Sequence, residues 1–312
     1  MERVANNKFH FIYGLEQYIN WKYGKNNNRY TILQFFKKWY CNKDYYALRN
    51  LIIEEVKRGY TEQSKEFINN LLFNFLDHKI YTRLQLKHIA HTLNDPFCSS
   101  LAKFAIFFPD INLDNYLSKG QIESKIWLLD TLQSYEFFTN VEKIAIFGCW
   151  YNFLGSFLLE EYDLDMIRGF DIDADACYKA DINLEKYVNN NWNYKSCILD
   201  VNNIEVIEKS NIVRYWIQNA HGSNILEETI FDLIINTSCE HMVDTWLTKL
   251  GQGQKVLLQT NNMKHLEEHI NCCESLDHAI EKYSKYGEII WAGSKTMVTD
   301  YERYMIILKT RV

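Results

Sequence analysis

Four short residues follow apolar runs in the second half of the chain, and they are the first candidates for a ligand site. Gly148 follows the run 143–147, Asp171 follows 166–170, Asp200 follows 196–199, and Asn236 follows 231–235. In an open parallel sheet, ligands bind at the carboxyl ends of the strands, near the point where the strand order reverses. The pattern therefore predicts one site at these strand ends, although a polar residue after a strand can also simply begin a turn.

Asp171 is the clearest of these candidates. An acidic side chain after a second strand can accept hydrogen bonds from both hydroxyls of a ribose. Asp173 is expected instead to cap a helix that begins at residue 174. The loop from Gly148 is not GxGxxG, because Trp150 stands where a dinucleotide pyrophosphate needs a glycine, and this disfavours NAD. Trp150 and its neighbour Tyr151 could stack on a sulfonium, or they could simply pack in the core.

The elements that must position these residues divide the chain into two parts. Residues 1–118 show apolar repeats at helical spacing, at 48–56, 67–75, 84–89 and 101–108, which predict an all-α domain of four to six helices. Residues 119–312 alternate short apolar runs with helical stretches at 121–135, 174–188 and 264–271, and end with runs at 287–292 and 304–308. This rhythm predicts an α/β, Rossmann-like, mostly parallel seven-stranded sheet whose last strand is antiparallel.

Composition and charge exclude several classes of protein. Apolar residues make up 47% of the 312 residues, which is too many for a disordered chain. Residues 1–118 hold 16 Lys and Arg against 11 Asp and Glu, a net of +5, so the remainder carries −11 of the total of −6. The chain has no dense basic run, which makes a nucleic-acid partner unlikely without excluding it. With no long apolar span, no signal-like start and eight Cys without a CxxC pair, we expect a cytoplasmic protein with reduced thiols and no membrane segment.

From residue 143 onward the chain resembles a class I S-adenosylmethionine-dependent methyltransferase. Segment 143–155 resembles the first motif of that family, 169–173 the second, 199–201 the third and 231–236 the fourth, so the resemblance covers about 170 of the 312 residues. It departs from the family in the first motif, where aromatic residues replace the usual glycine-rich stretch.

The resemblance implies S-adenosyl-L-methionine as the cofactor. The residues expected to bind it are Gly148, Trp150, Tyr151, Asp171, Ile172, Asp200, Val201 and Asn236. It also places the reacting end of the cofactor at segment 236–241, with expected catalytic residues Asn236, Ser238, Glu240 and His241. The first two could hydrogen-bond the amino acid end of the cofactor or a substrate carboxylate, and Glu240 or His241 could remove a proton from the acceptor. The alternative is that Glu240 and His241 merely open the next helix.

The first functional hypothesis is methyl transfer to a small-molecule or peptide acceptor. The second is aminocarboxypropyl transfer, or cyclisation of the cofactor's own arm, with release of methylthioadenosine, because a helical domain on this fold is similar in architecture to nicotianamine synthase. A non-catalytic binding module and an NAD-linked oxidoreductase are further alternatives. The sequence does not give the acceptor or the oligomeric state.

Three further features of the sequence concern the helical domain, Lys125 and a possible metal site. The helical domain is expected to cap the pocket, and Tyr13, Trp21, Tyr23 and Trp39 could line it or pack in its core. Lys125 could pair with a carboxylate or lie on a solvated helix face. His265, Glu268 and His269 fit an HxxEH zinc pattern, but we expect no metal because a third ligand is needed and only 43 residues follow.

Overall fold

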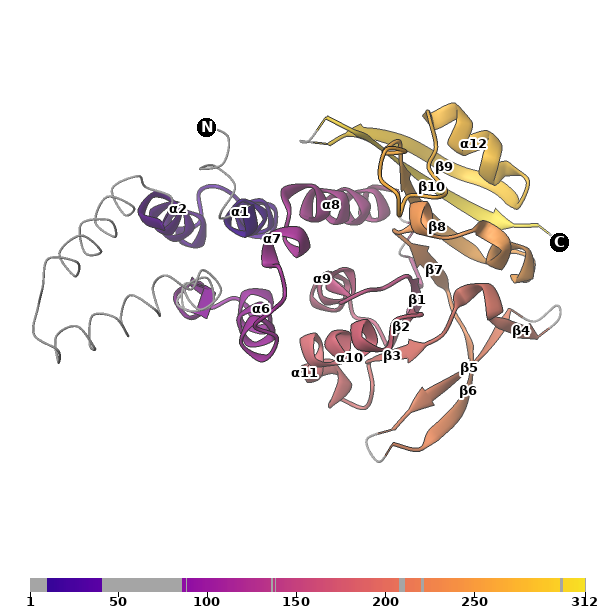
Figure 1. Cartoon of the computed structure of the whole chain (residues 1–312), viewed down its shortest axis with the longest axis horizontal. Helices are drawn as coiled ribbons and strands as arrows, with labels where there is room; N and C mark the ends of the chain where they lie inside the picture. The colour runs from indigo at the N-terminus through magenta and orange to yellow at the C-terminus, as the bar shows by residue number, and fades with distance from the viewer. Residues whose placement is uncertain are drawn as a thin grey trace, which may run out of the picture. The chain divides into compact units, whose positions relative to one another are not determined.

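The chain forms two compact units, Met1–Ile126 and Trp127–Val312, in a computed structural model. The structure describes residues 10–40, 86–87, 89–135, 137, 139–207, 211–219, 222–297 and 300–311 (Figure 1). The helices expected at 48–56 and 67–75 lie outside this part of the chain. The domain limits predicted from the sequence, 1–118 and 119–312, stay a prediction.

The regular elements of the first unit in its described residues are all helices, joined by turns, as the apolar repeats predicted. Its helices are α1 (His10–Tyr23), α2 (Asn28–Tyr40), α6 (Pro96–Phe107), α7 (Leu113–Tyr116) and the first part of α8 (Lys119–Ser134). Asp95 caps α6 by accepting a hydrogen bond from the Cys98 N–H at 2.8 Å, and Pro96 occupies the first turn, where no N–H is needed. The sequence Asn94-Asp95-Pro96 is typical of a break followed by a helix start.

Asp95 also joins α1 to α6. Its Oδ2 accepts hydrogen bonds from the hydroxyls of Tyr18 at 3.2 Å and Tyr23 at 2.7 Å. Of the aromatic residues expected to line a pocket, Tyr13 is exposed and Trp21 and Tyr23 are half-buried, while the side chain of Trp39 lies outside the described part. The Lys125 ammonium donates to Oε1 of Gln121 on the same helix at 2.8 Å, as expected for a residue on a helix face.

The second unit is built around a seven-stranded sheet. Its strands are β1 (Lys143–Phe147), β2 (Met166–Asp171), β3 (Tyr194–Ile198), β7 (Leu233–Asn236), β8 (Lys255–Asn261), β9 (Gly287–Thr296) and β10 (Glu302–Thr310). Their order is β3-β2-β1-β7-β8-β10-β9, and β10 pairs antiparallel with both of its neighbours whereas the first five strands are parallel. This is the Rossmann-like sheet of the class I methyltransferase type, and the predicted fold class is confirmed.

Layers on both sides of the sheet explain its apolar strands. Residues Ile144–Phe147 of β1 are all buried, as a parallel strand covered on both faces requires. Figure 1 shows α9 (Phe153–Glu161), α10 (Ala174–Asn183) and α11 (Glu185–Val188) on one side of the sheet and α12 (Leu276–Ser284) on the other. None of the helices in the described residues is long and apolar enough to cross a membrane.

A second sheet was not expected from the sequence. Strands β4 (Glu205–Ile207), β5 (Ile212–Gln218) and β6 (Asn224–Ile230) form an antiparallel sheet between β3 and β7 in the chain. Tyr215 on β5 meets Phe170 of the large sheet edge to face, with ring centroids 5.2 Å apart. Arg168 of β2 is buried and pairs with Glu227 of β6 at 3.3 Å. The small sheet thus completes the core on one face of the large sheet.

The prediction of a helix at 264–271 is wrong. The structure has consecutive turns there, closed for example by the Leu266 N–H on the Met263 carbonyl and the His269 N–H on the Leu266 carbonyl. A surface helix needs an apolar stripe to bury, but this stretch offers only Leu266 and Ile270, and Ile270 is 66% exposed. The stretch expected as one helix at 174–188 is divided into α10 and α11 at Leu184.

Candidate functional site at the strand ends

The loops after β1 and β7 meet where the strand order reverses. The Ser238 hydroxyl donates a hydrogen bond to the Gly148 carbonyl at 3.3 Å. Gly148 has φ +61°, and a Cβ there would lie 2.8 Å from Cε of Met242 and 3.2 Å from Cβ of Ser238. The backbone conformation therefore favours glycine at position 148, and a larger residue would also have to displace the end of the Met242 side chain.

The loop after β1 turns through left-handed residues where related folds use glycines. Trp150 and Asn152 have φ +48° and +50°. Oδ1 of Asn152 caps α9 by accepting from the Gly155 N–H at 2.9 Å, and the Tyr151 carbonyl accepts from Nδ2 of Asn183 at 3.0 Å. The rings of Trp150 and Tyr151 stack with centroids 4.4 Å apart. Asn adopts the left-handed conformation readily, whereas Trp150 is held in one that its residue type disfavours.

Asp171 fixes this loop as well as ending β2. Its Oδ2 accepts a hydrogen bond from the Trp150 N–H at 2.8 Å, and its Oδ1 accepts from the Asp173 N–H at 3.0 Å. An ionised carboxylate has about four lone-pair directions, so each oxygen keeps one acceptor position. Asp173 caps α10 through the Asp175 N–H at 2.8 Å, as predicted. The sequence predicted a ligand role for Asp171 but missed its role in the loop.

Exposed apolar side chains lie at the ends of three neighbouring strands. Trp150 is 42% exposed, Ile172 71% and Ile198 60%. Ile172 was predicted as a ligand residue, whereas Ile198 was missed because it lies inside an apolar run. Large apolar side chains that are exposed to solvent at neighbouring strand ends are typical of a surface that a ligand covers.

In the segment 199–201, which resembles the third motif, one candidate residue lies near the surface and the other in the core. Asp200 is half-buried and caps a 3₁₀ turn, Val201–Asn203, through the Asn202 N–H at 2.9 Å. Val201 is only 5% exposed and packs in the core of the unit, so its side chain lies away from the surface on which the sequence placed it.

Asn236 is fully buried at the end of β7. Its Oδ1 accepts from the Ser238 N–H at 2.9 Å and its Nδ2 donates to the Met242 sulfur at 3.1 Å. The residue therefore shapes the loop from within. Ser238 is half-buried and lies against Gly148.

Glu240 lies inside the protein rather than at the surface. It is 3% exposed, and its Oε1 accepts from Nη2 of Arg303 at 3.0 Å and from Nδ2 of Asn261 at 2.7 Å. The other oxygen, Oε2, is buried and has no hydrogen-bond partner among the described residues. Glu240 is therefore a buried, ion-paired side chain and not the open base that the sequence suggested. Both Glu240 and His241 lie in the short 3₁₀ helix Cys239–His241, so the next helix does begin here, although it is a single 3₁₀ turn.

His241 is exposed and its tautomer is defined by its contact. Its Nδ1 lies 3.1 Å from the Glu268 carbonyl, which can only accept, so Nδ1 is the donor of this bond, and in a neutral imidazole the lone pair is then on Nε2. His269 is half-buried, and its ring meets that of His241 edge to face at 4.6 Å. Burial lowers the pKa of His269, and His241 lowers it further, while Glu240 acts in the opposite direction.

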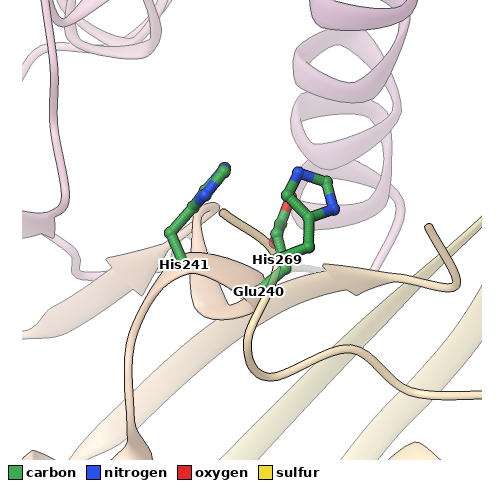
Figure 2. Close-up of side chains that lie close together, drawn as sticks. All are labelled: Glu240, His241 and His269. Atoms are coloured by element: carbon green, nitrogen blue, oxygen red, sulfur yellow. The ribbon is translucent and has the colours of Figure 1, made fainter. Parts of the chain in front are cut away.

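Figure 2 shows Glu240, His241 and His269 gathered at one place, from two loops far apart in the sequence. One ligand atom of each side chain lies within 4.8 Å of the others. The HxxEH pattern had pointed to His269 together with His265, but His265 is exposed and does not belong to this group. Residues 240 and 269 are brought together only by the turns after β7 and β8.

Comparison with known proteins gives likeness in structure only. No family model matches the sequence, and no curated protein matches it. N-methyltransferase NodS from Bradyrhizobium japonicum WM9 in complex with S-adenosyl-L-homocysteine has TM-score 0.45 and 13% identity, over 69% of this chain and 98% of that one. Geranyl diphosphate C-methyltransferase from Streptomyces coelicolor A3(2) has TM-score 0.40 and 9% identity, over 61% and 80%. The [4+2]-cyclase SpnF has TM-score 0.44 and 9% identity, over 60% and 81%.

Proposed function

We propose that this protein is an S-adenosyl-L-methionine-dependent methyltransferase that acts on a small-molecule or peptide acceptor. The observation that carries the proposal is the convergence of three strand-end loops at the switch point of the sheet. Asp171 joins the loops after β2 and β1 through the Trp150 N–H, and Ser238 joins the loops after β7 and β1 through the Gly148 carbonyl. Ligands of open α/β sheets bind at this place.

The adenosine half of the cofactor would lie over the ends of β2 and β3. The free acceptor positions of Asp171 suit the two ribose hydroxyls, and the exposed side chains of Ile172 and Ile198 offer apolar surface for the adenine ring. Asp200, at the end of the next strand, would accept from the adenine amino group. The exposed indole of Trp150 could contact the sulfonium, a cation–π contact of about 0.5–2 kcal/mol.

The transfer needs an acceptor in line with the methyl group and a place for its proton. Positioning two reactants supplies most of the rate in such a displacement. The Nε2 lone pair of exposed His241 is the proton acceptor that the loop after β7 offers, whereas Glu240 is buried and paired. Ser238, with its backbone fixed by Asn236, would orient the amino acid end of the cofactor.

Isothermal titration of the purified chain with S-adenosylmethionine, S-adenosylhomocysteine and NAD tests the cofactor. We expect the first two to bind and NAD not to bind. If S-adenosylmethionine does not bind, the proposed function is wrong. Mass spectrometry of the reaction products then separates the two uses of the cofactor, because methyl transfer releases S-adenosylhomocysteine and attack on the carbon arm releases methylthioadenosine.

The cell compartment and the acceptor-binding part of the chain are also proposals. We place the reaction in the cytoplasm, because all seven cysteines of the described residues are free thiols, in keeping with a reducing compartment. Nucleic acid is not the expected acceptor. That residues 1–118 form a domain that contacts the acceptor stays a prediction.

A further inference from the structure

We propose that Glu240, His241 and His269 together bind one divalent transition-metal ion of the Zn²⁺ type. Their ligand atoms lie within 4.8 Å of one another (Figure 2). Two ligands at about 2.1 Å from one ion are separated by about 3.4–4.2 Å, so the side chains must close by roughly 1 Å. His241 is exposed on a short turn, so a small shift of that turn can close this distance while Nδ1 keeps its hydrogen bond to the Glu268 carbonyl.

The hydrogen bond of His241 prepares it as a ligand. Donation from Nδ1 to the Glu268 carbonyl leaves Nε2 as the free lone pair. Histidines that bind metals usually donate their other N–H to a carbonyl or carboxylate in this way, which fixes the tautomer and the orientation of the ring. Glu268 is the neighbour of His269, so the bond also ties together the two loops that supply the ligands.

The carboxylate of Glu240 has one oxygen held and one oxygen to spare. Arg303 and Asn261 both donate to Oε1, while Oε2 is buried and has no partner among the described residues. A buried charged oxygen without a partner is costly, and an ion bound to it removes that cost. Carboxylates that bind metals are themselves commonly hydrogen-bonded by outer residues, which is the role that Arg303 and Asn261 would have.

The chemistry of the three groups selects the kind of ion. Arg303 balances the charge of Glu240, so two imidazole nitrogens supply much of the affinity. Mg²⁺ and Ca²⁺ prefer several oxygen ligands, whereas imidazole suits Zn²⁺, Fe²⁺, Ni²⁺ and Cu²⁺. Three protein ligands leave coordination positions open, as in catalytic rather than structural zinc sites. In the metal-bound protein Nε2 of His241 holds the ion instead of accepting a proton. If the proposed function holds, the open positions lie beside the loop after β7 and would take an oxygen or nitrogen atom of the acceptor, whose proton the ion makes easier to release to water.

Titration of the metal-free full-length chain with Zn²⁺, in the absence of S-adenosylmethionine, tests the site. We expect one ion per chain by calorimetry and by elemental mass spectrometry after dialysis, and no competition from Mg²⁺. His241→Ala and His269→Ala should each weaken Zn²⁺ binding by more than about 100-fold, because even the outer partners of metal ligands are worth about 10–100-fold. His265→Ala is the matched control, an exposed histidine in the same loop as His269, and it should leave the affinity unchanged.

His241→Ala keeps the test clear of folding effects, since that side chain is exposed, whereas Glu240→Gln would leave Arg303 without its counter-charge. Thermal unfolding without metal should show that His241→Ala is folded, with a loss of stability no greater than that of one exposed hydrogen bond. Absence of Zn²⁺ binding would overturn the proposal, and so would equal loss in His265→Ala. Binding that survives both ligand changes but disappears in Cys272→Ser would place the ion at the thiol and overturn it too. Because no S-adenosylmethionine is present, failure of the proposed function leaves this result unaffected.

Discussion

Replacement of Asp171 by alanine should weaken binding of S-adenosylmethionine without unfolding the protein. A hydrogen bond to a charged group contributes about 1.5–3 kcal/mol, and the carboxylate is expected to accept from the ribose through positions that the Trp150 and Asp173 N–H groups leave free. The loss therefore corresponds to a dissociation constant about 10- to 150-fold higher. Isothermal titration with S-adenosylmethionine and S-adenosylhomocysteine measures both affinities.

The same change also removes the acceptor of the Trp150 N–H, so part of the loss could come from a looser loop. Asp173→Ala is the control, because Asp173 caps α10 two residues away and is exposed. Losing that cap should lower the free energy of unfolding by about 1 kcal/mol and leave cofactor affinity unchanged. Equal affinity in Asp171→Ala and the unchanged chain, or an equal loss in Asp173→Ala, would refute the assignment of the ribose contact to Asp171.

Three further predictions concern stability and are checked by chemical unfolding. Gly148→Ala should lower the free energy of unfolding by at least about 1–2 kcal/mol, because φ is +61° and the new Cβ would meet the loop after β7; an unchanged midpoint would contradict this. Arg168→Ala should cost about 3 kcal/mol, because it removes the charged partner of Glu227 and leaves that carboxylate only the hydrogen bond from the Tyr215 hydroxyl; an unchanged midpoint would show that the pair is unimportant. Burial, and then the hydrogen bond to Asp95, raise the pKa of Tyr23 to about 12 from 10.0. The difference in free energy of unfolding between the unchanged chain and Tyr23→Phe should therefore be constant below pH 10. It should become less favourable to the unchanged chain as the pH rises toward 12, and a change in the opposite direction would contradict this prediction.

Much of the fold is local enough to be predicted from the chain alone. The run 143–147 coincides with β1, and Asp95, Pro96 and Asp173 mark helix starts, because strand periodicity and helix caps depend on residues only a few positions apart. The antiparallel last strand was also predicted, since two apolar runs with a short polar connection can pair only in that way. The sheet β4–β6 was missed because β5 carries apolar residues on its outer face too, such as Trp216 beside buried Tyr215, so polar and apolar residues do not alternate in its sequence.

Part of the candidate site could likewise be predicted from the sequence, and the rest depends on the tertiary structure. Asp171 and Gly148 were found because each directly follows an apolar run, so position in the chain gives position at the sheet edge. The burial of Glu240 could not be predicted, because its partner Arg303 lies 63 residues away on the antiparallel strand β10. His269 was tied to the wrong partner for the same reason. Side chains from β7, β8 and β10 meet only after the strand order is set, and that order depends on the packing of whole layers.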